Sequence, residues 1–176
     1  MNSPSLLIDV RSILESLGET IELDVDVALP TLALGSEEFV PTGDARLVGS
    51  MTNTGAGVVL SATLDVSLRA ECCRCLKEFV LPVSVRVDGF YVAHGSERDL
   101  PAEQEVGFID SGGVDIMHAI VSALTLELPY APVHDEDCRG ICPTCGVDRN
   151  DATCGCAPEF VSSPFSGLKD LFPSDE

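Results

Sequence analysis

The side chains best suited to chemistry in this sequence are eight cysteines, which lie in two groups. Two residues separate Cys72 from Cys75, a spacing that lets a tight turn direct both thiolates at one metal ion. The same spacing recurs between Cys142 and Cys145 in the second group. With a neighbouring histidine included, the second group consists of His134, Cys138, Cys142, Cys145, Cys154 and Cys156. These patterns predict zinc binding.

A tetrahedral zinc site needs four ligands, and these side chains can be divided into two sites with four ligands each. One site would be all-thiolate and would consist of Cys142, Cys145, Cys154 and Cys156. The other would combine the two groups through Cys72, Cys75, His134 and Cys138. Cys73 is left without a role. Because a Zn²⁺ ion with four protein ligands has no open position for water, both sites are expected to be structural.

Redox chemistry is the competing interpretation, since the Cys72–Cys75 pair has the spacing of a dithiol switch. A thioredoxin-like motif begins a helix in a βαβ unit, whereas this pair lies between two predicted strands. A generic zinc-stabilised adaptor is a further alternative. No catalytic set is evident elsewhere, because Gly55-Ala56-Gly57 lacks the Lys-Ser/Thr of a phosphate loop, and a triad built on three histidines would be speculation. We therefore expect no enzyme and no small-molecule substrate.

The charge of the chain indicates its partners and its compartment. A net charge of −19 disfavours non-specific RNA binding, and favours basic partners such as ribosomal proteins. Four basic residues nevertheless cluster near the first cysteines, at Arg69, Arg74, Lys77 and Arg86. There is no apolar run long enough for a membrane span, and the first residues do not resemble a secretory signal. We expect a cytoplasmic protein, in which clustered thiols bind metal.

The elements that must position the cysteines are predicted to be mainly strands. Residues 21–27 alternate apolar and acidic side chains, and residues 45–51, 58–68 and 79–90 complete an antiparallel meander that is partly closed like a barrel. A short amphipathic helical turn is expected over residues 10–17, and a loop over residues 31–44.

One main helix is predicted over residues 114–128, where apolar residues recur at helical spacing before Pro129. The fold class is thus mainly β (α+β), with a core domain over residues 1–129. Residues 130–160 contain too few large apolar side chains to fold without a metal, and form a cysteine-rich zinc-binding appendage. Residues 161–176 are expected to be an acidic docking tail.

Taken in order, these motifs resemble one family. The string Cys72-Cys73-Arg74-Cys75-Leu76 precedes the predicted helix. Pro132-Val133-His134-Asp135 and the run from Cys138 to Gly146, Cys-Arg-Gly-Ile-Cys-Pro-Thr-Cys-Gly, follow it. The sequence from about residue 5 to residue 172 is similar to the YceD family, the large ribosomal RNA subunit accumulation proteins.

The resemblance implies a non-enzymatic role in 23S rRNA accumulation and in assembly of the large ribosomal subunit. It supports the same cysteines as metal ligands, and His134 stands where many relatives have a cysteine, an exchange that preserves zinc chemistry. The partner would be a large-subunit rRNA precursor and/or a basic ribosomal protein. Contacts with RNA are assigned to Arg69, Arg74, Lys77 and Arg139. The sequence departs from the family in the turn at 147–150 and in the tail motif at 163–165.

Overall fold

The computed structural model describes residues 5–96, 101 and 105–156. The chain divides into two compact units, the first ending at Cys138 and the second beginning at Arg139. This boundary lies beyond residue 129, where the sequence analysis placed it. The expected docking tail, residues 161–176, falls outside the described residues. Within the part of the chain that is described, no helix is long and apolar enough to cross a membrane.

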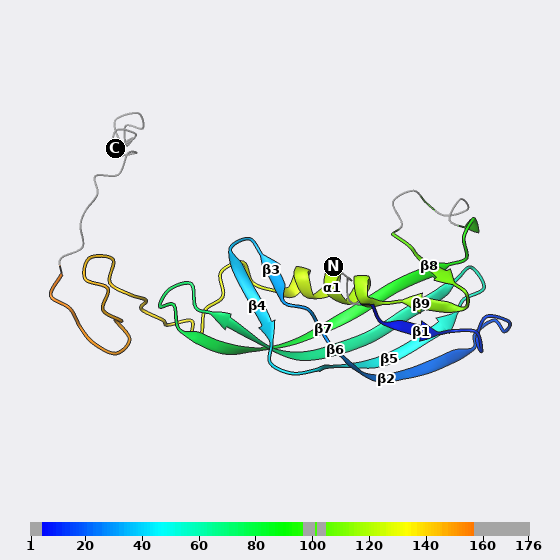
Figure 1. Ribbon diagram of the computed structural model, residues 1–176, viewed down its shortest axis with the longest axis horizontal. Helices are drawn as coiled ribbons and strands as arrows, with labels where there is room; N and C mark the ends of the chain where they lie inside the picture. The colour runs from blue at the N-terminus through cyan, green and yellow to red at the C-terminus, as the bar shows by residue number, and fades with distance from the viewer. Residues whose placement is uncertain (1–4, 97–100, 102–104, 157–176) are drawn as a thin grey trace, which may run out of the picture. The chain divides into compact units, whose positions relative to one another are not determined.

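The described residues of the first unit form a nine-stranded sheet and one helix (Figure 1). The strands are β1 (Leu7–Asp9), β2 (Thr20–Val27), β3 (Leu32–Leu34), β4 (Glu37–Pro41), β5 (Ala45–Asn53), β6 (Val58–Glu71), β7 (Glu78–Val92), β8 (Gly107–Asp110) and β9 (Gly113–Asp115). The helix is α1 (Met117–Glu127). Hydrogen-bonded neighbours follow the order β1-β9-β8-β7-β6-β4-β3, while β5 pairs with β6 and with β2.

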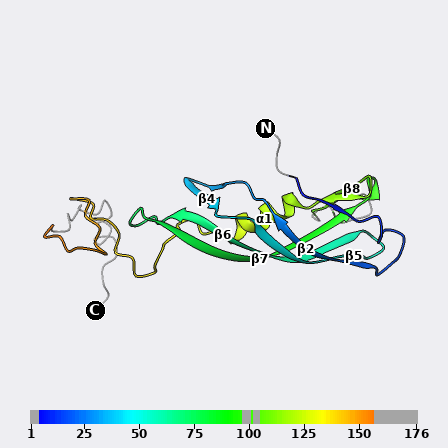
Figure 2. The same cartoon turned by 60° about the horizontal axis from the view of Figure 1, so that its bottom comes forward.

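The mainly β class is confirmed, but the expectation of a partly closed antiparallel meander is only partly correct. Strands β5, β6 and β7 do form an antiparallel meander, and Figure 2 shows them as long curved strands side by side. Strand β8, however, runs parallel to β7, so the sheet is mixed. Among the described residues no pairing joins β1 to β2 or β3, and the sheet is therefore open.

The β6–β7 hairpin carries the first cysteine pair at its tip. Its strands pair continuously from Val58 opposite Tyr91 to Glu71 opposite Glu78. Even-numbered side chains of β6 are buried and most odd-numbered ones are exposed, because apolar and polar residues alternate with the two-residue period of a strand. Such alternation specifies which face joins the core, and the hairpin can therefore extend to its tip in one register.

The helix covers the core face of the sheet beside β7 (Figure 1). Ile116, Ile120, Leu124 and Leu128 are buried at a spacing of four residues, as the sequence predicted. The helix begins later than residue 114, because residues 113–115 form β9. At its start the Asp115 carboxylate accepts hydrogen bonds from the backbone N–H groups of Met117 and Leu6, both at 3.0 Å. This carboxylate ties the N-terminal segment to the helix start.

Two local predictions were wrong. Residues 10–17 form successive turns instead of a helix, because the buried Asn53 side chain donates hydrogen bonds to the carbonyl groups of Ile13, Leu14 and Ser16. The backbone bonds within this segment span three residues, as from the N–H of Ser16 to the carbonyl of Ile13 at 3.4 Å. Residues 31–44 were expected to be a loop but contain the β3–β4 hairpin, which turns at Gly35 with φ 66°. Its Phe39 is fully buried in the core.

Candidate metal centres

The six-residue loop that joins β6 to β7 has a tight backbone geometry. The N–H of Cys72 donates to the carbonyl of Lys77 at 2.9 Å, and the N–H of Leu76 donates to the carbonyl of Cys72 at 2.8 Å. Leu76 closes the turn with φ 61°, a left-handed conformation that is rare for a residue with a side chain. This geometry turns Cys72 and Cys75 toward the same point.

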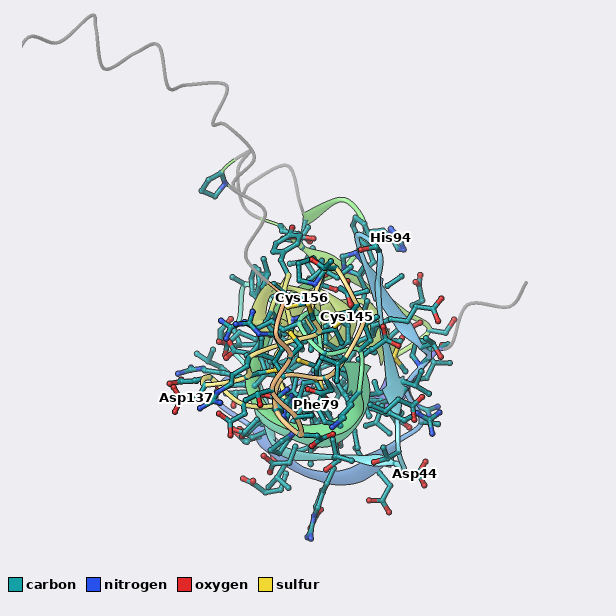
Figure 3. All side chains as sticks on the ribbon, turned by 90° about the vertical axis from the view of Figure 1, so that its left-hand side faces the viewer. Asp44, Phe79, His94, Asp137, Cys145 and Cys156 are labelled. Carbon is teal, nitrogen blue, oxygen red and sulfur yellow. The ribbon has the colours of Figure 1, made fainter. Side chains whose placement is uncertain are left out.

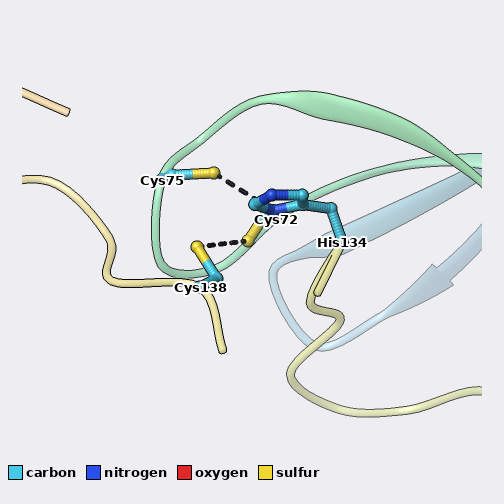
Figure 4. Close-up of side chains that lie close together, drawn as sticks. All are labelled: Cys72, Cys75, His134 and Cys138. Carbon is cyan, nitrogen blue, oxygen red and sulfur yellow. Dashed lines mark hydrogen bonds between the residues drawn. The ribbon is translucent and has the colours of Figure 1, made fainter. Parts of the chain in front are cut away.

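The segment after α1 brings the remaining two ligands to this loop. Figure 4 shows Cys138 beside Cys72, and His134 beside Cys75. The Sγ atoms of Cys72 and Cys138 are 3.8 Å apart, and the Sγ of Cys75 is 3.4 Å from Nδ1 of His134. All four potential ligand atoms lie within 4.8 Å of one another. The structure thus brings together the mixed set that ligand counting had proposed.

These distances fit the edges of a tetrahedral metal site. With bonds of about 2.3 Å to sulfur and about 2.0–2.1 Å to nitrogen, neighbouring sulfurs are about 3.8 Å apart and a sulfur and a nitrogen about 3.5 Å apart. The measured 3.8 Å is far longer than a disulfide bond of about 2.05 Å. The three thiols are at most 5% exposed, and Phe79 and Val133 pack against them. The three thiols are thus shielded from solvent, whereas the His134 side chain lies at the surface.

Two contacts from the loop anchor the ligand-bearing segment. The backbone N–H of Cys73 donates to the carbonyl of Pro132 at 2.8 Å. One guanidinium nitrogen of Arg74 donates to the carbonyls of Glu136 and Cys138, at 2.8 Å and 3.0 Å. Arg74 therefore positions the chain around a ligand, a role that sequence reasoning missed. Its place inside the Cys-x-x-Cys turn was the available signal.

The electrostatics of the mixed site favour a bound cation. Burial acts to raise the pKa of the Cys72 thiol, but hydrogen bonds from His134 and from the backbone outweigh it and lower the pKa to about 5. Burial and the adjacent Cys72 thiol raise the pKa of Cys75 to about 11. Neighbouring thiolates repel one another, so all three thiols can be ionised together only if a positive ion compensates them.

The second unit contains a turn of the same geometry. The N–H of Cys142 donates to the carbonyl of Val147, and the N–H of Gly146 donates to that of Cys142, both at 2.8 Å. Gly146, with φ 73°, stands where Leu76 stands in the first turn. The two Cys-x-x-Cys turns are therefore equivalent in hydrogen bonding as well as in spacing, and we call them the proximal turn (72–77) and the distal turn (142–147).

The distal turn contributes to an all-thiolate cluster with Cys142, Cys145, Cys154 and Cys156, whose sulfurs lie within 4.8 Å of one another. Figure 3 shows Cys145 and Cys156 next to each other. Backbone hydrogen bonds from Cys145 and Thr144 lower the pKa of Cys142 to about 6. The Cys145 thiol and burial raise the pKa of Cys156 to about 12. As in the mixed site, a bound cation would compensate the repulsion between neighbouring thiolates.

The described residues of the second unit are joined by backbone turns and polar hydrogen bonds. Neither apolar cluster of the described residues includes a side chain after Cys138. A single bridge pairs Ile141 with Asp148, and the amide oxygen of Asn150 accepts a hydrogen bond from the N–H of Arg139 at 2.8 Å. Asn150 lies in the turn where the sequence departs from the family, and its side chain joins this turn to the start of the second unit. A small unit without an apolar core needs a cross-link such as a metal ion.

The residues assigned to RNA contact are placed differently from one another. Arg69, Arg74 and Lys77 are exposed in or beside the proximal turn, but the Arg74 side chain is engaged with two carbonyls. Glu71 and Glu78 face each other across the hairpin in the same region. Arg139 belongs to the second unit. The basic residues at this tip are thus interspersed with carboxylates.

Fold and site together define a β-rich protein with two clusters of four side chains that could each hold a metal ion. The family model for the large ribosomal RNA subunit accumulation protein YceD matches residues 60–172, which include both clusters. The chain belongs to the YceD family.

Individual relatives match over a shorter part of the chain. An uncharacterized protein of Mycobacterium tuberculosis (strain ATCC 25618 / H37Rv) is 36% identical over 92 residues, which are 52% of this chain and 44% of the relative. An uncharacterized protein of Mycobacterium leprae is 31% identical over 91 residues, or 51% and 42% of the two chains. The matched part of this chain thus spans less than half the length of these relatives. No solved structure matches.

Proposed function

We propose that this protein is a non-enzymatic factor for 23S rRNA accumulation and large ribosomal subunit assembly in the cytoplasm. The observation that carries the proposal is the family match, which covers every member of both ligand clusters. The family description names accumulation of large-subunit rRNA. The partner is a large-subunit rRNA precursor and/or a basic ribosomal protein.

Zinc is the metal that best suits the two clusters. Four thiolates, or three thiolates and one imidazole, at tetrahedral distances are typical donor sets for structural Zn²⁺. Each cluster already supplies four ligands, so neither leaves a position at which a water molecule could be activated. One ion would stabilise the proximal turn at the tip of the β6–β7 hairpin, and the other would stabilise the second unit. The protein would then act by presenting a folded surface to its binding partner.

The acidic character of the chain favours the protein-partner version of this function. With 29 acidic and 10 basic residues, the surface attracts a basic ribosomal protein more strongly than an rRNA backbone. The carboxylates around Arg69 and Lys77 reduce the positive potential at the hairpin tip. We therefore place a basic protein as the first partner, with rRNA contacts at the tip as a second contribution.

The test is to delete the protein and measure the ratio of 23S to 16S rRNA together with the profile of ribosomal subunits. We expect deletion to lower 23S rRNA and large subunits, and the intact chain to restore them. Cys138→Ser and Cys154→Ser chains should restore them poorly, and the Cys73→Ser chain fully. An unchanged 23S level after deletion would favour a plain adaptor without a ribosomal role. Pull-down with and without nuclease then separates protein contacts from contacts through RNA.

The redox alternative has less support from the site geometry. Cys72 is fully buried, and its Sγ lies 3.8 Å from that of Cys138, within a cluster of four ligands. A dithiol switch needs an accessible thiolate that attacks a disulfide. Stoichiometric metal in reduced protein, with no thiol that reacts at neutral pH except Cys73, would exclude the switch.

A further inference from the structure

A groove of about 650 Å³ lies between α1 and the β7 edge of the sheet, in the first unit and apart from both cysteine clusters. One wall is the helix, and the other is the second half of β7 with the start of β8. Side chains from the two walls include Phe90, Tyr91, Ala119, Ala123 and Leu126. Leu126 is 88% exposed and adds apolar surface to the helix wall of the groove.

Among the described residues, most of the outer edge of β7 beside this groove is not paired with another strand. The bond from the N–H of Cys72 to the carbonyl of Lys77 marks a hydrogen-bonded pair, and such pairs alternate along an antiparallel ladder. Odd-numbered residues of β7 therefore bond to β6, and even-numbered ones direct their N–H and C=O groups outward.

Two further observations agree with this alternation. Ser67, opposite Pro82, directs its carbonyl away from β7, where it accepts a hydrogen bond from the N–H of Thr42 at 3.0 Å. Pro82 is an even-numbered residue, so its missing N–H costs no bond to β6, as expected for proline on an edge strand. Among the described residues, β8 pairs with this edge only at Tyr91 and Val92. The outward groups of Ser84, Arg86 and Asp88 thus have no strand beside them in the part of the chain that is described.

The charges around the groove are predominantly negative. Arg86 is neutralised by Asp88, with Nε 2.8 Å from a carboxylate oxygen. Three further carboxylates line the groove, at Glu105, Asp115 and Glu127, against one histidine, His118, whose Nδ1 is 4.0 Å from the Glu105 carboxylate. A lysine or arginine side chain suits this lining, because its aliphatic stem can cover Ala119, Ala123 and Leu126 while its charge reaches Glu105 or Glu127.

We propose that this groove binds an extended, lysine- or arginine-containing segment of a protein partner, which adds a strand to the outer edge of β7 at residues 84–88. The backbone of the segment bonds to the outward N–H and C=O groups, as in other cases of strand addition. Alternate side chains enter the groove against α1. The inference rests on the proposed function only for the identity of the partner as a basic ribosomal protein.

Amide hydrogen exchange of the metal-loaded full chain tests the backbone contact. The probe is a short synthetic peptide of alternating lysine and valine, compared with a glutamate–valine peptide and with single-stranded RNA. We expect the lysine peptide to slow exchange at Arg86 and Asp88, while Val85 and Val87 are already protected by β6. Exchange at the edge strand β2 should stay unchanged. N-methylation of alternate peptide groups should abolish binding, because it removes the hydrogen bonds that a strand supplies.

Charge reversal tests the recognition of basic side chains. The double variant Glu105→Lys/Glu127→Lys should bind the lysine peptide roughly tenfold more weakly. Glu22→Lys/Glu38→Lys is the matched control, because it makes the same change of net charge at exposed positions on β2 and β4, and its affinity should stay within about twofold of the unchanged chain.

Equal weakening in the two double variants would overturn the proposal, since it would show only long-range attraction. Peptide binding without protection of Arg86 and Asp88, or stronger protection by RNA than by the peptide, would overturn it as well. None of these results bears on metal content or on 23S rRNA levels, so failure here is distinguishable from failure of the proposed function.

Discussion

The Sγ atoms of Cys72 and Cys138 lie 3.8 Å apart, although 66 positions separate the two residues in the sequence. The contact connects the tip of the β6–β7 hairpin to the segment that follows α1. A metal ion between them would close this long loop of chain, and closing long loops removes conformational entropy from the unfolded state. The mixed site is therefore expected to stabilise the first unit, whereas the all-thiolate site acts within the second.

Metal content provides the most direct prediction. Reduced, freshly purified protein should contain about two Zn²⁺ ions per chain, one for each cluster of four ligands. Cys138→Ser and Cys154→Ser should each remove one ion, as measured by native mass spectrometry. Cys73→Ser is the control, because Cys73 is exposed and belongs to neither cluster. Full metal content in both of the first two variants would show that these clusters are not metal sites.

His134 should be replaceable by cysteine but not by alanine. His134→Cys keeps four ligands, whereas His134→Ala leaves three and opens the site to water. With Co²⁺ in place of Zn²⁺, we expect the ligand-to-metal charge-transfer band of the mixed site to grow in His134→Cys by about a third, since a fourth thiolate joins three. Competition with a chelator should show metal loss from His134→Ala first. An unchanged affinity in that variant would exclude His134 as a ligand.

Arg74 is predicted to position the mixed site. Arg74→Ala removes two hydrogen bonds to the carbonyls of Glu136 and Cys138, which should lower the free energy of unfolding by about 1–3 kcal/mol. Metal affinity of the mixed site should fall roughly tenfold, as for other residues that orient ligands. Arg69→Ala, a change at an exposed position on β6, serves as the control for lost charge. Similar metal affinities in the two variants would contradict this role.

The two equivalent turns predict that adding a side chain at Gly146 destabilises the protein, whereas removing the one at Leu76 has little net effect on stability. Gly146→Ala places a side chain at φ 73° with no neighbouring atom within 4 Å, so its cost is conformational and amounts to about 1 kcal/mol. Leu76→Gly relieves the same strain at φ 61°, and its net effect should stay within about 1 kcal/mol because glycine loses more entropy on folding. Denaturant unfolding of the metal-loaded variants measures both. A large loss of stability in Leu76→Gly would show that its side chain has another role.

Asp115 should make stability depend on pH. Burial acts to raise the pKa of this carboxyl, but hydrogen bonds from the N–H groups of Met117 and Leu6 outweigh it and lower the pKa. A lowered folded-state pKa contributes stability above the unfolded value of about 3.9, and this contribution is lost as the pH falls through the folded value.

Asp115→Asn should therefore be less stable than the unchanged chain at pH 6, and the difference should shrink below about pH 4. Urea unfolding of both proteins across this range measures the effect, and metal release at low pH is common to the two chains. If the difference in unfolding free energy between the two proteins does not change with pH, the negative charge of Asp115 does not contribute to stability.

The sequence by itself determined the elements and ligand sets whose signals are local. Two-residue alternation predicted β2, β6 and β7, a strand was also expected at the position of β5, and apolar residues at helical spacing predicted α1. Counting ligands proposed the two sets that the structure brings together, because Cys-x-x-Cys steps require only a tight turn and a tetrahedral ion requires four donors.

Only the tertiary structure decided the features that depend on distant partners. The Asn53 side chain holds residues 10–17 in turns from across the fold, and the short β3–β4 hairpin forms because Phe39 is buried in the core. Strand β8 pairs with β7 only at Tyr91 and Val92, which leaves the outer edge of β7 along the groove without a strand among the described residues. Arg74 became a positioning residue in the same way, since its two acceptors lie more than sixty positions away. The free energy of such contacts depends on which distant segments come together in the folded chain. The local sequence pattern of one segment does not specify its partner.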